Sequence, residues 1–472
     1  MKVFFTTAPI SFEKRYGSFA GGGSTAPALG ILMLAAVARN EGFDCSVVDA
    51  SALSLSEEEL MERLSVIRPD ILCISSTTLA IGNAHSFAVK ARNLLPALRI
   101  VVGGPHATAA PDETMERFSV FDIAVVGEGE ETLAELLRAL RHGTALAAVK
   151  GLIYREGNEL KSTGRQPFIH DLDSLPFPAW DLLEQFPARY LPAPFKVRKL
   201  PAATLVTSRG CPNVCIFCDR SVFGFSCRFY SAEYVVRQMT ELYHRYGIRE
   251  FTLEDDTFIT FKKRLKEICE RLIDLRLDIS WTCLGRVDHV TVDNLQLMRK
   301  AGCWQISFGI ESGSQEILTL INKRVTLEQI RQAVFLCKKA GLRPKGFFII
   351  GHPGETKETI KQTVDFALEL PLSDISASLM TPFPGTELYR RAAEFGEFNP
   401  DWENMNLLNV VFIPHGLTRE DLLTAQKELI RRFYFRPRIA ADYGSRLLYN
   451  PSMAKGIWNG FRSLVRSVRQ RP

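Results

Sequence analysis

The sequence predicts an α/β protein with a doubly wound Rossmann-like domain, then a partial (β/α)6 barrel, then a helical C-terminal extension. Three observations predict this order. Short apolar stretches alternate with amphipathic ones over most of the chain, which is typical of parallel sheets covered by helices. A proline-containing stretch interrupts the alternation near the middle, and helical periodicity replaces it beyond residue 397. A hydrophobic content of 46% and a charged content of 24% in 472 residues are ordinary for a globular chain of two or three domains.

The first domain is expected over residues 1–145. Its apolar stretches predict strands at 3–5, 45–49, 71–75, 100–102 and 123–126. Its amphipathic stretches predict helices at 28–41, 56–67, 83–95, 111–118 and 130–141. Strands joined by helices in this way form a parallel sheet with right-handed crossovers.

The loops that follow these strands are the candidate ligand-binding segments, because ligands of doubly wound domains bind at the carboxyl ends of the strands. Glycines there let the backbone approach a large planar or phosphorylated ligand, although tight strand-to-helix turns explain each pair nearly as well. His106 follows Gly-Gly-Pro in a turn, which favours a hydrogen bond within the loop. The candidate residues are Ser75, Thr77, Gly103, Gly104, His106, Gly127, Glu128 and Gly129.

Residues 146–200 are expected to link the two domains. Residues 152–155 predict a short strand and residues 156–159 a hairpin turn. Prolines stiffen the extended stretch at 170–178.

The barrel is expected over residues 201–395. Six strands are predicted, at 203–207, 251–253, 279–282, 305–308, 347–350 and 375–379. Polar residues follow them, so the site of a partial barrel would lie at the carboxyl ends of its strands. The candidate residues are Glu254, Asp255, Asp256, Ser307, Glu311 and Gly351. The three carboxylates would alternatively cap a helix that begins near Phe261.

Cys211, Cys215 and Cys218 follow the first barrel strand at a CxxxCxxC spacing. Cysteine thiolates hold iron-sulfur clusters, usually four to a cluster, so three of them leave one iron open for a small molecule. A zinc site or three core cysteines are the alternatives, but zinc motifs normally contain two separated pairs. The other seven of the ten cysteines are expected to be small core residues in a reducing compartment.

With Phe217 before the third cysteine and an apolar strand before the loop, this motif resembles the radical S-adenosylmethionine (radical SAM) enzymes. The resemblance implies a 4Fe-4S cluster on Cys211, Cys215 and Cys218 whose free iron binds S-adenosylmethionine. It further implies that residues 254–256 accept the methionyl amino group, that Ser307 and Glu311 contact the ribose, and that Gly351 begins the adenine-side loop.

Residues 28–30, 103–106 and 127–130 resemble the cobalamin-binding domain that precedes the radical SAM domain in one large subfamily. The candidate loop residues of the first domain would then bind cobalamin. The DxHxxG sequence that supplies a histidine to cobalt in methionine synthase is absent. Either cobalt has no histidine below it, as is usual in this subfamily, or cobalamin binding has been lost. The resemblance covers residues 1–395.

This resemblance implies formation of a 5′-deoxyadenosyl radical and methylation of an unactivated carbon of a hydrophobic small molecule, with flavodoxin or ferredoxin as electron donor. Oxidative cyclisation or rearrangement with the same cofactors, as in anaerobic tetrapyrrole cyclases, is the alternative. An iron-sulfur redox sensor is a third hypothesis, but a sensor has no need of polar residues at the ends of five further strands.

The remaining features concern location. A net charge of +5 is small for this length, and no nucleic acid partner is expected. No secretory signal is visible and the apolar run at 26–38 is too short to span a bilayer, so a cytoplasmic protein is expected. Residues 446–472 are basic, with apolar residues at helical spacing. This tail either packs on the barrel or lies on an anionic membrane and collects a lipid-like or tetrapyrrole substrate.

Overall fold

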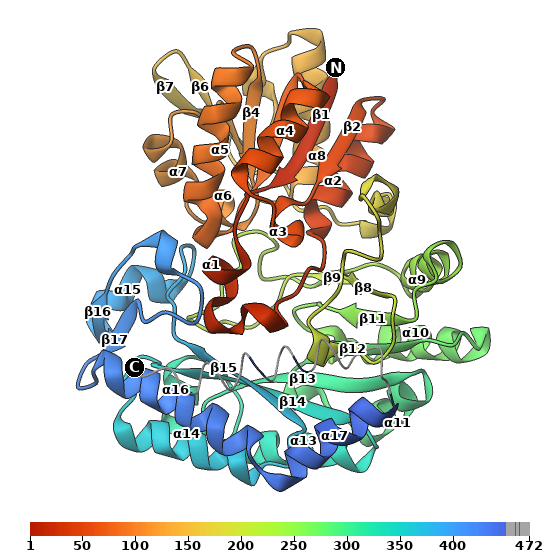
Figure 1. Ribbon diagram of the computed structural model, residues 1–472, viewed down its shortest axis with the longest axis vertical. Helices are drawn as coiled ribbons and strands as arrows, with labels where there is room; N and C mark the ends of the chain where they lie inside the picture. The colour runs from red at the N-terminus through yellow and green to blue at the C-terminus, as the bar shows by residue number, and fades with distance from the viewer. Residues whose placement is uncertain (450–457, 459–461, 463–472) are drawn as a thin grey trace.

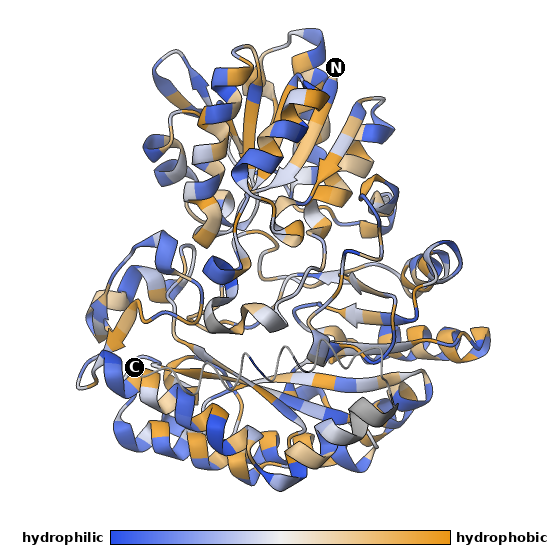
Figure 2. Ribbon diagram, viewed as in Figure 1, coloured by the Kyte–Doolittle hydropathy of each residue, from blue (hydrophilic) through white to orange (hydrophobic). Residues whose placement is uncertain are grey.

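The computed structural model describes residues 1–449 together with Trp458 and Arg462. It confirms the expected fold class, with an α/β domain, a curled parallel sheet and a helical C-terminal part in that order (Figure 1). In Figure 2 the strands of the first sheet are largely hydrophobic, while the surrounding helices carry both hydrophilic and hydrophobic stretches.

The first sheet has the order β2-β1-β3-β4-β5-β6-β7, and its first five strands are parallel. Side chains alternate along β1, so that Val3 and Phe5 enter one hydrophobic core and Phe4 enters another on the opposite face. The parallel strands are β1 (Lys2–Thr7), β2 (Asp44–Val48), β3 (Ile71–Ser75), β4 (Arg99–Gly103) and β5 (Ile123–Val125). The helices are α2 (Leu29–Asn40), α3 (Ala50–Leu53), α4 (Glu57–Ile67), α5 (Ile81–Leu94), α6 (Pro105–Ala109), α7 (Pro111–Arg117) and α8 (Gly129–His142).

The hairpin expected in the linker belongs to this sheet. Strand β6 (Leu152–Glu156) pairs antiparallel with β5, and β7 (Glu159–Ser162) pairs with β6. The hairpin occupies the edge of β5, whose backbone groups would otherwise lack partners on that side. The sheet therefore extends to Ser162, and residues 163–201 connect it to the barrel.

The second sheet is a curled half-barrel of six parallel strands in the order β15-β14-β13-β12-β11-β8. The strands are β8 (Ala202–Leu205), β11 (Glu250–Leu253), β12 (Ser280–Gly285), β13 (Cys303–Glu311), β14 (Arg343–Ile350) and β15 (Asp374–Leu379). The helices are α9 (Ala232–Tyr246), α10 (Lys262–Leu275), α11 (Val292–Lys300), α12 (Gln315–Leu320), α13 (Leu327–Lys339), α14 (Lys357–Glu369) and α15 (Glu387–Phe395).

The chain between the barrel and the last helices departs from the expected helical pattern. Strands β16 (Gly396–Phe398) and β17 (Phe412–Pro414) pair antiparallel. Between them, residues 399–411, which we call the return segment, pack against the first domain. The ring of Trp402 contacts His106, and Glu403 forms an ion pair with Lys14 at 3.4 Å.

Two helices follow, α16 (Arg419–Tyr434) and α17 (Pro437–Tyr449). Helix α16 begins with a capping box in register, because Thr418 caps Asp421 N–H and the Asp421 side chain accepts from Thr418 N–H. Among the described helices, none is both long enough and apolar enough to cross a bilayer. The basic amphipathic tail lies outside the described residues, apart from 446–449, Trp458 and Arg462.

Candidate active site

The three cysteines lie in the loop between β9 (Ser208–Arg209) and β10 (Arg228–Phe229), which we call the cysteine loop. Two backbone hydrogen bonds anchor its centre: Ile216 N–H donates to Ile321 C=O at 3.2 Å, and Leu388 N–H donates to Ile216 C=O at 2.9 Å. All three thiols are free, with Cys215 buried and Cys218 exposed. Among the described residues, no three metal-binding side chains surround a position for a single ion, whereas a four-iron cluster takes each thiolate on a different iron.

Two cations face the buried end of this loop. Lys323 Nζ donates to Glu311 Oε1 at 2.7 Å, and Arg286 Nη2 donates to Lys323 C=O at 3.1 Å. A hydrogen bond from Cys218, with the positive charges of Lys323 and Arg286 beyond it, lowers the pKa of Cys215 to about 6. The surroundings therefore favour the thiolate of Cys215, which is the form that binds iron, while the hydrogen bond to Cys215 and burial raise the pKa of Cys218.

The carboxylates after β11 have three different environments. Glu254 forms an ion pair with Lys196 at 2.9 Å. Asp255 is fully buried and accepts hydrogen bonds of 2.5 Å from the Thr207 backbone N–H and hydroxyl, which holds the start of the cysteine loop. Asp256 is the exposed member. The alternative of a helix cap is wrong, since Phe261 is the N-cap of α10 and no side chain caps that helix.

The end of β13 brings Glu311 to Lys323, a residue that the sequence analysis missed. Ser307 is buried on the same strand. A Cβ on Gly309 would lie 2.4 Å from Glu311 Oε1 and 2.8 Å from Lys323 Nζ, so the absence of a side chain there makes room for the ion pair. A lysine after a short helix has no local signal that marks it as buried.

The loop after β14 encloses two buried side chains, His352 and Glu355, that carry unpartnered polar atoms. Gly351 has φ +94°, and its N–H donates to Glu355 Oε2 at 2.6 Å. His352 is fully buried and meets Phe217 of the cysteine loop edge to face, with ring centroids 5.8 Å apart. Burial lowers the pKa of His352 to about 3 and raises that of Glu355 to about 8. Among the described residues, neither ring nitrogen of His352 nor Glu355 Oε1 has a hydrogen-bond partner.

The glycine loops of the first domain meet at the carboxyl edge of its sheet. Close packing explains two of these glycines. A Cβ on Gly104 would lie 2.7 Å from Ser75 Oγ, and a Cβ on Gly129 would lie 3.0 Å from Leu34. Gly127 has φ +94° and donates its N–H to Thr108 Oγ1 at 3.1 Å. Thr77 is exposed beside them, and Gly103 is half-buried.

His106 and Glu128 are both buried and already partnered. His106 Nδ1 lies 3.2 Å from Thr78 Oγ1, which belongs to the loop after β3 and not to the loop of His106 itself, and Trp402 covers the ring. Glu128 uses both carboxylate oxygens, on Arg209 at 2.9 Å and on Arg228 at 2.8 Å. The sequence indicated a hydrogen bond for His106 but not its partner Thr78, and it gave no sign of the two arginines that pair with Glu128.

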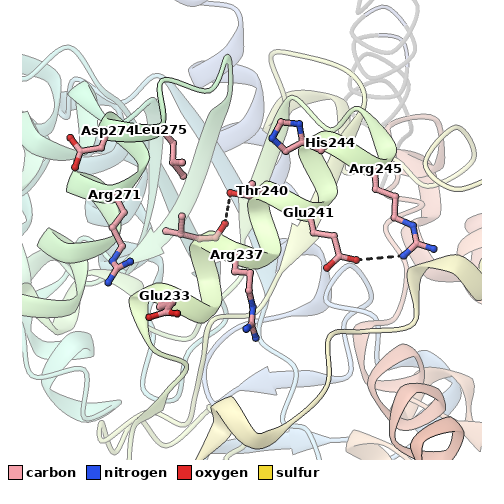
Figure 3. A pocket seen from close by; sticks show the side chains of 10 residues that line it. Glu233, Arg237, Thr240, Glu241, His244, Arg245, Arg271, Asp274 and Leu275 are labelled. Atoms are coloured by element: carbon pink, nitrogen blue, oxygen red, sulfur yellow. Dashed lines mark hydrogen bonds and ion pairs between the residues drawn. The ribbon is translucent and has the colours of Figure 1, made fainter.

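A surface hollow of about 820 Å³ lies elsewhere, between α9 and α10 (Figure 3). Arg237, Glu241 and Arg245 of α9 and Arg271 and Asp274 of α10 line it, and Glu241 forms an ion pair with Arg245 at 3.5 Å. Since both helices lie outside the barrel and no strand end reaches this hollow, it is separate from the predicted site.

Two family models match the chain. The Radical SAM superfamily covers residues 205–367 and the B12 binding domain covers residues 20–137. An uncharacterized methyltransferase of Pyrococcus horikoshii is 35% identical over 419 residues, which are 88% of this chain and 90% of the relative. An anaerobic magnesium-protoporphyrin IX monomethyl ester cyclase of Cereibacter sphaeroides is 31% identical over 421 residues, 88% of this chain and 68% of the relative.

Two solved structures share the fold. The cobalamin-dependent S-adenosylmethionine radical enzyme OxsB, with aqua-cobalamin and S-adenosylmethionine bound, aligns with a TM-score of 0.75 at 19% identity, over 98% of this chain and 72% of that chain. The radical S-adenosylmethionine methyltransferase TsrM from Kitasatospora setae aligns with a TM-score of 0.68 at 19% identity, over 83% and 74%. The chain belongs to the cobalamin-dependent radical SAM enzymes, whose cofactors are a 4Fe-4S cluster, S-adenosylmethionine and cobalamin.

Proposed function

We propose that this enzyme transfers a methyl group from cobalamin to an unactivated carbon of a hydrophobic small molecule. The observation that carries the proposal is the methyltransferase from Pyrococcus horikoshii, which is 35% identical and matches nearly end to end. The contact between the cysteine loop and the glycine loops supports the proposal. Because of this contact, the proposed sites of the two cofactors are close enough to act on one substrate.

The chain offers a fitting set of groups for the cluster and S-adenosylmethionine. We assign the cluster to Cys211, Cys215 and Cys218, and the nearby cations Lys323 and Arg286 favour the thiolate of Cys215. Asp256 is the exposed carboxylate for the methionyl ammonium. When bound, the cluster and S-adenosylmethionine supply the 5′-deoxyadenosyl radical, and cobalamin supplies the methyl group.

The remaining contacts to S-adenosylmethionine are assigned to the ends of β13 and β14. Ser307 and Glu311 are proposed for the ribose hydroxyls. The serine hydroxyl can donate or accept a hydrogen bond, and the glutamate carboxylate can accept one from a ribose hydroxyl. The loop from Gly351 to Glu355 is proposed for adenine, because His352 and Glu355 hold unpartnered polar atoms that a base edge can satisfy.

In the first domain, Ser75, Thr77, Gly103, Gly104, Gly127 and Gly129 are proposed to line cobalamin, with no histidine on cobalt. His106 is buried beneath Trp402, and the protein contains no DxHxxG sequence. Electron paramagnetic resonance of the cob(II)alamin form tests this: nitrogen superhyperfine splitting from a protein histidine would contradict it.

The test of the function is anaerobic reconstitution with the three cofactors, a reductant and extracts of cells that lack the gene. S-adenosylmethionine labelled in its methyl group should yield 5′-deoxyadenosine and one labelled product that gains a methyl group. The Cys215→Ala variant is the control. Unlabelled product formed together with 5′-deoxyadenosine would instead support the second candidate, oxidative cyclisation or rearrangement, which the 31% identical cyclase favours.

We further propose a cytoplasmic enzyme with a lipid-like or tetrapyrrole substrate, a flavodoxin or ferredoxin as electron donor, no nucleic acid partner, and peripheral membrane contact through the basic tail. Basic amphipathic segments bind anionic lipid, and salt weakens that binding. Full-length protein should float with anionic vesicles, whereas a truncation ending at Tyr449, which keeps α17, should not. Equal flotation of the two would contradict the membrane proposal.

A further inference from the structure

Two motifs that lie in different domains are joined by ion pairs almost completely shielded from water. One is the loop at 127–130 of the first domain, and the other is the start of the cysteine loop at 208–211. Arg209 Nη1 contacts Glu128 Oε1 at 2.9 Å, and its Nη2 contacts Glu130 Oε1 at 2.5 Å. The exposed fractions of these three side chains are 6%, 2% and 8%.

A second arginine completes the cluster. Arg228 Nη1 contacts Glu128 Oε2 at 2.8 Å and also donates to the Ile169 carbonyl at 2.7 Å. Glu128 Oε2 accepts a further hydrogen bond from Ile169 N–H at 2.9 Å. Two carboxylates therefore face two guanidinium groups, and removal of any one leaves an uncompensated buried charge.

Aromatic rings hold the two arginines in place. The Arg209 guanidinium lies 5.3 Å from the ring of Phe223, and the Arg228 guanidinium lies 4.7 Å from the ring of Phe168. Phe168 in turn packs against Gly224, where a Cβ would lie 2.7 Å from the ring. The network thus includes the linker and the far side of the cysteine loop as well as the two motifs.

The backbone on each side is short and constrained. Only Gly210 separates Arg209 from Cys211, and its φ of +85° and its packing leave little freedom, because a Cβ there would lie 2.3 Å from the Ser226 carbonyl. Glu128 stands between Gly127 and Gly129 of the proposed cobalamin loop. A displacement of either loop must therefore move the ion pairs.

We propose that Glu128 and Arg209, with Glu130 and Arg228, are positioning residues that couple the two cofactor sites, so that an ordered cysteine loop strengthens cobalamin binding. The inference rests on the proposed assignment of these loops to the cluster and to cobalamin. Coupling between two binding sites is reciprocal, so bound cobalamin would equally stabilise the cluster.

The test measures the dissociation constant of cobalamin, by absorbance under anaerobic conditions, with and without the reconstituted cluster. In the wild-type protein we expect cobalamin to bind about tenfold more tightly when the cluster is present. In Glu128→Gln and Arg209→Gln the ratio of the two constants should fall to about one, and the double variant should resemble the single ones. Arg331→Gln is the matched control, since it removes an arginine from an exposed ion pair with Glu369 at 2.7 Å.

Ion pairs that only stabilise the contact between the domains would give a different result. Their loss would weaken cobalamin binding by the same factor with and without the cluster. A wild-type ratio of one, or a wild-type ratio kept in both single variants, overturns the proposal. If the glutamine variants fail to fold, Arg209→Lys replaces them. It keeps the positive charge but contacts only one of the two glutamates, so the ratio of the two dissociation constants should be intermediate. Methyl transfer is measured separately, so a protein that shows coupling but transfers no methyl group would contradict the proposed function alone.

Discussion

The ring of His106 lies edge-on to the ring of Trp402, with centroids 4.4 Å apart, although the two residues come from the first domain and from the return segment. The guanidinium of Arg117 lies 5.0 Å from the same tryptophan ring. Trp402 is thus held between two cationic or polar groups of the first domain and fixes the return segment to it.

Replacement of Trp402 by alanine should release this contact. Truncation of a buried tryptophan costs about 3 kcal/mol of unfolding free energy, and Trp402 is 5% exposed. We expect the first domain to become susceptible to proteolysis and to lose stability in urea denaturation. Phe335→Ala, which removes a 59% exposed ring, is the control and should leave both measurements unchanged.

Stability should depend on pH through His106. Burial, together with the charge of Arg117, lowers its pKa from 6.5 to about 4. Between pH 6.5 and pH 4, His106 is therefore protonated in the unfolded chain but not in the folded chain. The contribution of His106 to the free energy of unfolding, present above pH 6.5, is lost as the pH falls toward 4. The loss between pH 7 and pH 5 amounts to about 2 kcal/mol.

Urea denaturation at these two pH values checks this. The variant His106→Gln cannot take up the proton and should lose less stability over the same interval. An equal loss in the variant and the wild type would assign the effect to other groups, among them His352, whose pKa is lowered to about 3.

Cys211→Ala, Cys215→Ala and Cys218→Ala should each abolish the cluster absorbance and the cleavage of S-adenosylmethionine. Cys227→Ala should leave both largely intact, because that thiol donates to the Gly210 carbonyl at 3.2 Å and lies outside the motif. Ultraviolet-visible spectra and quantification of 5′-deoxyadenosine provide the measurements. A full cluster in Cys215→Ala would refute the assignment.

Lys323→Met should make the cluster harder to reduce. The substitution removes a buried cation that favours negative charge at Cys215 and leaves Glu311 unpaired. We expect a more negative midpoint potential in redox titrations followed by electron paramagnetic resonance, and an intermediate value in the double variant Lys323→Met/Glu311→Gln. Lys323→Arg keeps the charge and serves as the control; an unchanged potential in Lys323→Met would contradict the prediction.

The sequence predicted what local patterns encode. Both sheets, the strand that leads into Cys211 and the polar residues at the strand ends follow from apolar runs and their spacing. The pairing of β6 with β5, the return segment and the partners of Glu128 did not follow. Each depends on contacts between segments that are distant in sequence, such as Glu128 and Arg228, and such contacts leave no periodic signal.

The buried glutamates illustrate the limit most clearly. A Gly-Glu-Gly-Glu sequence after a strand is equally compatible with a carboxylate that meets a ligand and with one that meets an arginine. Only the position of Arg209, set by the packing of the second domain, decides between them.

The return segment also restricts how the first domain can move. Residues 163–201 connect the domain to the barrel on one side of Figure 1, and the β16 and β17 region lies on the opposite side. The ion pairs of Arg209 with Glu128 and Glu130 attach the domain at a third place. A rotation about the line through the linker and the return segment would have to move these buried ion pairs, so the first domain and the barrel are expected to keep one relative orientation.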